Sequence, residues 1–147
     1  MRAAALAAVL WLLAAGPAPA AFTLPSGVVP LSDLPAARAK ARREGKALAF
    51  LFVDTRGGCG LCAQAARLAA ERLSPAAVVV HVDPRSDLGR MPSLVRDALR
   101  SPAAGQVSPR LAVTDAAVRR VIAVVPFRYG KAYEAALDGA LRRIRGR

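Results

Sequence analysis

Hydrophobic positions along the chain fall into two patterns, short continuous runs and runs at helical spacing. Residues 47–53 (ALAFLFV) and 77–83 (AVVVHVD) are almost wholly apolar. Both runs are too short for an independent helix and predict strands buried on both faces. Two further apolar runs, 110–114 and 118–125, are joined by a short turn at Asp115-Ala116 and predict a hairpin.

Apolar residues at helical spacing predict four helices, at residues 36–44, 59–73, 92–100 and 130–145. The first helix has Pro35 in its opening turn, with Ser32 or Asp33 as its cap. The segment before it is rich in Pro and Gly and predicts an extended entry, with an edge strand near Val28-Val29. Strand, helix and strand in succession make a parallel pair, whereas a hairpin makes an antiparallel one. We therefore predict an α/β fold with a mixed sheet and helices on both faces.

The first twenty residues have the pattern of a secretory signal peptide. Met1-Arg2 is a short basic start, residues 3–15 are an apolar run, and Ala18-Pro19-Ala20 is a small-x-small cleavage site. The apolar run is shorter than the roughly 20 residues that span a bilayer, so a retained membrane anchor is the weaker interpretation. We expect a signal peptide over 1–20, an entry segment over 21–32 and one domain over 33–147, in a periplasmic or secreted protein.

The formal net charge of +12 would suit an anionic membrane surface, nucleic acid or an acidic partner. The basic residues are scattered, however, and aromatic residues make up only 5% of the chain. No nucleic-acid-reading motif accompanies the charge, so we expect no nucleic-acid partner.

The only two cysteines, Cys59 and Cys62, lie where a predicted buried strand gives way to a predicted helix. Free N–H groups and the positive end of the helix dipole stabilise a thiolate there. We expect a lowered pKa for Cys59, the outer thiol and nucleophile, and Cys62 is placed to resolve a mixed disulfide. Arg56 could add a cation near the thiolate.

Two other interpretations of the cysteine pair are open. A structural disulfide closing so small a ring would stabilise the fold by only ~2 kcal/mol on chain-entropy grounds, so it would brace little. A zinc site needs four ligands, and the remaining candidate, His81, is a single histidine in a strand. We therefore expect no metal. Because His81 alternates with Val80 and Val82, we interpret it as a packed or hydrogen-bonded residue.

Ser108-Pro109 stands directly before the strand at 110–114. Proline is tolerated at the first residue of a strand because it has no ladder hydrogen bond to donate there. Only about 5–6% of X–Pro bonds in folded proteins are cis, so the sequence by itself leaves the isomer open.

These features together resemble the thioredoxin-fold proteins, in particular their exported members. The resemblance runs over roughly residues 33–145. It is carried by Gly45-Lys46 before an apolar strand, the Cys59-Gly60-Leu61-Cys62 motif at a helix start, the VVVHVD strand, Ser108-Pro109 before the hairpin, and the closing amphipathic helix.

The resemblance implies a thioredoxin-like three-layer α/β/α fold with a mixed central sheet. It also implies a thiol-disulfide oxidoreductase without a bound cofactor, in which Cys59 attacks a substrate disulfide and Cys62 resolves. Pro109, in cis, would pack beside the pair and, with Ser108, help to hold a substrate segment. The expected partners are protein thiols and disulfides and a redox partner protein, and we expect a monomer with no stable membrane anchor after cleavage.

The chain departs from the family pattern at three places. Gly58 stands where the family usually has Trp before the first cysteine, and Leu61 stands where it has Pro. Val53 occupies the position of the buried acid found in many members, with Asp54 one place later and expected on the other face.

The alternative function is a non-catalytic binding module on the same fold, with the cysteine pair as a local structural disulfide. Its basic surface, including Arg142, Arg143, Arg145 and Arg147, would meet an acidic partner. Such cations also interact favourably with the negative end of a helix, which is a second explanation for their position.

Overall fold

The computed structural model describes residues 21–146. The predicted signal peptide at 1–20 lies outside the described residues. Within 21–146, no helix is both long and apolar enough to cross a membrane.

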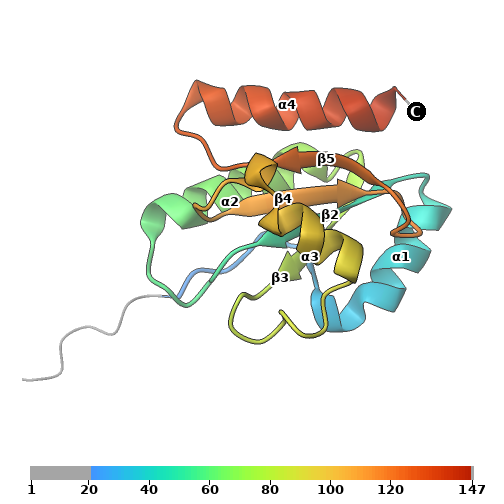
Figure 1. Cartoon of the computed structure of the whole chain (residues 1–147), viewed down its shortest axis with the longest axis horizontal. Coiled ribbons are helices and arrows are strands. Elements are labelled where there is room, and N and C mark those ends of the chain that lie inside the picture. Colours follow the sequence, from blue (N-terminus) through green and yellow to red (C-terminus); the bar gives the residue numbers. More distant parts are fainter. Residues whose placement is uncertain (1–20, 147) are drawn as a thin grey trace, which may run out of the picture.

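A five-stranded mixed sheet forms the centre of the molecule (Figure 1), in the order β1-β3-β2-β4-β5. The strands are β1 (Val29–Pro30), β2 (Ala47–Phe52), β3 (Ala77–Val82), β4 (Arg110–Thr114) and β5 (Val121–Val125). The first three are parallel, while β4 runs antiparallel to both β2 and β5. The predicted buried strands and the predicted hairpin are therefore confirmed.

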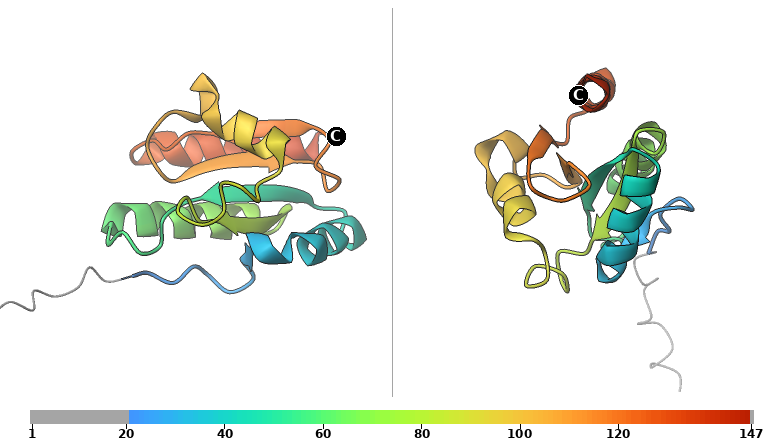
Figure 2. Two further views of the ribbon diagram at one scale, coloured as in Figure 1. Left: turned by 60° about the horizontal axis from the view of Figure 1, so that its bottom comes forward. Right: turned by 90° about the vertical axis from the view of Figure 1, so that its right-hand side faces the viewer.

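Four helices cover the sheet: α1 (Leu34–Arg43), α2 (Gly60–Leu73), α3 (Ser93–Arg100) and α4 (Lys131–Arg145). The two views of Figure 2 show helices on both sides of the strands. There are also two short 3-10 turns, Leu31–Asp33 and Pro102–Ala104. The sequence predicts no helix in either segment.

Side chains alternate between the two faces of the sheet along each strand, so the interior is divided into two cores. Ala49 and Leu51 of β2 point into a core shared with α2 and α4, whereas Phe50 and Phe52 point into a core shared with α1 and α3. All six residues of β2 are buried, which is the signature of a strand covered on both faces. The α/β fold with three layers, expected from the resemblance, is confirmed.

Asp33 occupies the N-cap position of α1, as predicted, although its side chain makes no capping hydrogen bond. The preceding 3-10 turn leads into the helix, with the Leu34 N–H donating to the Leu31 carbonyl. One predicted boundary is wrong. The second hairpin strand begins at Val121 rather than at Val118, because the Asp115 carboxylate accepts from the backbone N–H groups of the two residues before Val121 and extends the turn.

Candidate functional site

Cys59 and Cys62 form a disulfide at the N-terminus of α2, with their Cα atoms 5.2 Å apart. Cys59 is the N-cap residue, and its Sγ accepts a hydrogen bond from the backbone N–H of Cys62 at 3.1 Å. The predicted position of the pair, between a buried strand and a helix, is thus confirmed. The sulfur of Cys59 lies where the unpaired N–H groups of the helix end are available to stabilise negative charge.

The two cysteines differ in their exposure. Cys59 is exposed, whereas Cys62 is half-buried and packs against the core between the sheet and helices α2 and α4. Gly58, just before the pair, has φ +66°, a left-handed conformation that favours glycine over the tryptophan of the family pattern. The outer cysteine of the pair is therefore the more accessible of the two.

Ser108 and Pro109 lie beside the cysteine pair. The peptide bond between them is cis, as the resemblance implies. The Cys62 Sγ lies 3.8 Å from the Ser108 carbonyl oxygen, and the Ser108 hydroxyl donates to the Phe52 carbonyl at 3.2 Å. The structure thus brings together all four residues that the sequence singled out, from segments about fifty residues apart.

Arg110 is a residue of this region that the sequence analysis missed. Its guanidinium donates to the carbonyls of Leu99 and Gly105, and it lies 4.7 Å from the centre of the Phe52 ring. Burial lowers the pKa of Arg110 from its usual value. Arg110 thereby ties the segment leading to Ser108-Pro109 to α3 and β2. Its position, directly after a proline and at the head of an apolar strand, is the only sequence signal that could have pointed to it.

The loop charges near the pair are neutralised by one another. The Arg56 guanidinium is 2.8 Å from the Asp83 carboxylate, and that of Arg85 is 2.7 Å from Asp54. The pKa of Asp54 is lowered by the backbone N–H of Arg56 and then by Arg85. The cation expected near the Cys59 thiolate is thus shared with a carboxylate.

No carboxylate lies at the strand position where many family members bury an acid. Val53 is fully buried there and faces the same core as α2. The His81 ring nitrogen Nε2 is 2.9 Å from the Val53 carbonyl oxygen, which confirms His81 as a hydrogen-bonded residue. Within residues 21–146, no cluster of three or more His, Cys, Asp or Glu side chains could hold a metal.

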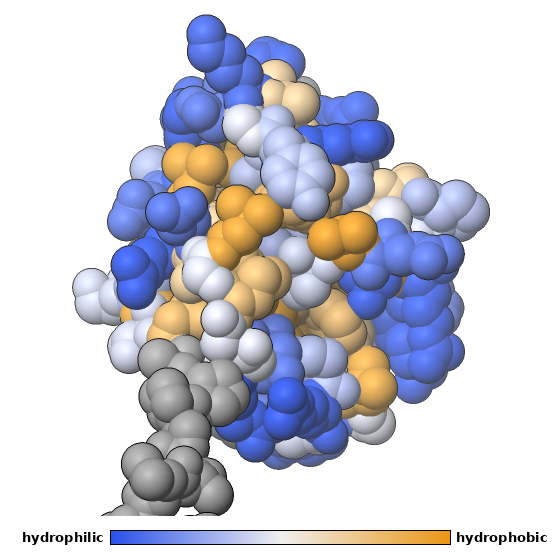
Figure 3. All heavy atoms as spheres, turned by 90° about the vertical axis from the view of Figure 1, so that its left-hand side faces the viewer, coloured by the Kyte–Doolittle hydropathy of each residue, from blue (hydrophilic) through white to orange (hydrophobic). Residues whose placement is uncertain are grey.

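A groove of about 170 Å³ lies beside the pair, between the start of α2 and the loop that leads into α4. Its lining includes Leu61 and Tyr129, which are 47% and 73% exposed, and the buried Tyr133. Burial raises the pKa of Tyr133, and its hydroxyl has no hydrogen-bond partner within the described residues. Figure 3 views the end of the molecule at which α2 begins and shows hydrophobic side chains gathered on it, with hydrophilic ones around them.

The fold is thioredoxin-like. This assignment rests on the strand order, the two helical layers and the position of the cysteines at the start of α2. Together the fold and the paired cysteines support a redox role in general terms.

The sequence matches no protein-family model and no curated protein. One solved structure similar to this chain is described as "DsbH Oxidoreductase". It is 17% identical over 85% of this chain and 88% of its own, with a TM-score of 0.46.

Proposed function

We propose that the protein is an exported thiol-disulfide oxidoreductase that exchanges its Cys59–Cys62 pair with disulfides of other proteins or of small molecules. The observation that carries the proposal is the asymmetry of the pair. Cys59 is exposed and its sulfur accepts a hydrogen bond from the N–H of Cys62, while Cys62 is half-buried. One sulfur is thus open to a partner, and the other is held ready to displace that partner.

In the reducing direction, the Cys59 thiolate attacks one sulfur of a substrate disulfide. The S–S bond of the substrate breaks, its other sulfur leaves as a thiolate that takes up a proton, and a mixed disulfide forms with Cys59. Cys62 then loses its proton and attacks the Cys59 sulfur, which releases the second substrate thiol and closes the Cys59–Cys62 disulfide. Two electrons pass from the pair to the substrate, and the same steps in reverse oxidise a dithiol.

The surroundings of the pair suit a polypeptide substrate. The Ser108 carbonyl lies next to Cys62, and the exposed Leu61 and Tyr129 offer apolar surface on the other side. A segment that crosses Cys59 would contact the Ser108-Pro109 backbone while it places an apolar side chain in the groove. These contacts would hold the substrate disulfide in line with the attacking sulfur.

Export is part of the proposal, and it is supported by the signal-peptide pattern of residues 1–20. N-terminal sequencing of the protein recovered from the expressing cell's envelope fraction should begin at Ala21. Recovery from the cytoplasm with Met1 in place would contradict export while leaving the exchange chemistry untouched.

The exchange chemistry is tested by one pair of variants. Cys59→Ser should abolish turnover of a model disulfide. Cys62→Ser should accumulate mixed disulfides through Cys59, because the resolving thiol is absent. The chain has only these two cysteines, so every trapped adduct of Cys62→Ser reports on Cys59. Turnover that survives in Cys59→Ser would overturn the assignment.

A further inference from the structure

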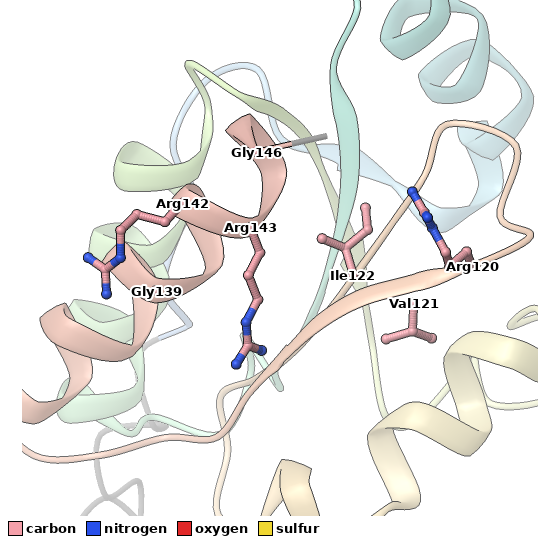
Figure 4. Close-up of a pocket in the computed structure, with 7 residues that line it drawn as sticks. All are labelled: Arg120, Val121, Ile122, Gly139, Arg142, Arg143 and Gly146. Atoms are coloured by element: carbon pink, nitrogen blue, oxygen red, sulfur yellow. The ribbon is translucent and has the colours of Figure 1, made fainter.

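A second groove, of about 640 Å³, lies between the C-terminal half of α4 and the start of β5 (Figure 4). It is lined by Arg120, Val121 and Ile122 from the strand side and by Gly139, Arg142, Arg143 and Gly146 from the helix side. These residues belong neither to the Cys59-Gly60-Leu61-Cys62 motif nor to the proposed exchange chemistry.

The groove follows the open edge of the sheet. The pairing of β5 with β4 is irregular here, since Val121 is opposite Thr114, Ala123 is opposite Val113, and Ile122 between them has no partner in the register. In Figure 4 the side chains of Val121 and Ile122 point to opposite sides of the strand, so the groove that touches both lies along its edge. In the part of the chain that the structure describes, β5 is the last strand in the order and pairs only with β4. An edge strand of this kind offers backbone N–H and C=O groups to another extended segment.

The charge around this edge is positive and unbalanced. Arg120, Arg142 and Arg143 are exposed, and within residues 21–146 none of them lies within 4.0 Å of a carboxylate. Among the described residues, no Asp or Glu lines the groove. The acid nearest to Arg120 along the chain, Asp115, accepts hydrogen bonds from the backbone N–H groups of the turn. The acid nearest to Arg142 and Arg143, Asp138, is paired with Arg72.

The groove lies at the opposite end of the molecule from the cysteines. β4 begins at Arg110, next to Pro109 and the cysteine pair. It ends at the opposite end of the sheet, where the hairpin turn contains Arg120. In Figure 1, α2 starts at the left and α4 ends at the right. A partner held in this groove would therefore leave Cys59 uncovered.

We propose that this groove docks an extended, acidic segment of a partner protein, which adds to the free edge of β5 and pairs its carboxylates with Arg120 and Arg143. In Figure 4 Arg143 extends from α4 toward β5, whereas Arg142 projects away from the strand and would meet only the outer part of a bound segment. Arginine suits this task because its planar fork binds carboxylates in a bidentate manner.

Charge complementarity decides between the possible occupants. A second copy of this chain would bring another net charge of +12 to an arginine-lined edge, which disfavours self-pairing. An anionic bilayer offers phosphate charge but no strand to pair with β5 and no narrow segment to enter a groove. An acidic extended segment satisfies both the free backbone edge and the arginines.

The test uses an acetylated and amidated peptide of four Val-Glu repeats, titrated into the full chain with calorimetry and with amide NMR spectra. The double variant Arg120→Gln/Arg143→Gln should bind the peptide at least tenfold more weakly than the parent. Its matched control is Arg67→Gln/Arg100→Gln, which loses the same two charges from exposed arginines on α2 and α3 outside the groove and should bind like the parent. NMR shifts should concentrate at residues 120–122 and 139–146.

Three outcomes would overturn the proposal. The first is equal weakening in both double variants, which would show unspecific attraction to the net charge. The second is undiminished binding of a Val-Glu peptide whose alternate backbone nitrogens are methylated, since strand addition needs those N–H groups. The third is failure to bind the peptide, whether or not vesicles of phosphatidylglycerol are bound through Arg120 and Arg143. None of these results bears on disulfide exchange, because the groove is remote from Cys59.

Discussion

At the scale of single residues, the account depends on how differently the two sulfurs are presented. Cys59 caps α2 and is exposed, and Cys62 one turn later is half-buried against the core and the Ser108 carbonyl. Leu61, between them, is 47% exposed. Contact with the substrate would explain why the apolar side chain of Leu61 is exposed next to the reactive sulfur.

Leu61→Ser should therefore reduce kcat/KM for a disulfide-containing unfolded protein by about fivefold, which corresponds to roughly 1 kcal/mol of lost apolar contact. Turnover of a small disulfide such as oxidised glutathione should change little, because it covers less of Leu61. Steady-state kinetics with both substrates would measure this.

Leu88→Ser is the matched control, since Leu88 is 43% exposed but does not line the groove beside the pair. Equal losses in both variants, or a loss for the small disulfide alone, would rule out a docking role for Leu61.

The sequence predicted Cys59 and Cys62 well because their position follows from hydrophobic patterning alone: a buried strand ends, and a helix begins. It also singled out Ser108-Pro109 by its place before a strand. It did not reveal the contacts of Tyr129 or Arg110, whose neighbours at the site belong to other segments of the chain. Their contacts depend on how the elements pack, and no local periodicity encodes that.

At the scale of elements, the hairpin between β4 and β5 shows how one side chain sets a boundary. The Asp115 carboxylate accepts hydrogen bonds from the backbone N–H groups of Arg119 and Arg120, at 2.7 and 2.8 Å. Val118 takes a positive φ of 57° within the same turn. These hydrogen bonds hold the chain in a turn until Val121. The apolar pattern predicted a strand from Val118 because hydrophobicity alone does not show that such bonds form.

The stability of this turn should depend on pH. Burial acts to raise the pKa of Asp115, but the backbone N–H groups of Arg120, Arg119 and Ala117 outweigh it, so this pKa lies below its ordinary value of 3.8. A carboxyl whose pKa is lowered on folding contributes stability above its unfolded pKa and loses it as the pH falls through the folded one. Protection of the Arg119 and Arg120 amides from hydrogen exchange should thus decrease below about pH 4.

Asp115→Asn is the control for that measurement, because it keeps an acceptor oxygen that does not titrate. Its amide protection should be nearly independent of pH over the same interval. If the parent and Asp115→Asn lose protection in parallel as the pH falls, the carboxylate is not what holds the turn.

At the scale of the whole molecule, the two ends of the sheet have different characters. The end with the cysteine pair combines an apolar groove with loop charges that are paired, Arg56 with Asp83 and Arg85 with Asp54. The other end carries exposed arginines along the edge strand β5, with no carboxylate partner among residues 21–146. The net charge of +12 is visible in the sequence, but the meeting of Arg120 with Arg142 and Arg143 in one groove depends on the hairpin and α4 coming together.

The central claim is that the Cys59–Cys62 pair is a working redox couple, and its reduction potential tests this most directly. The full chain would be equilibrated in glutathione and dithiothreitol buffers, and its free thiols would be counted by alkylation and mass spectrometry. The account predicts a potential between about −270 and −120 mV, the range of proteins that exchange disulfides, with rapid equilibration. A potential well below roughly −300 mV with slow exchange would contradict it and make the pair a structural disulfide.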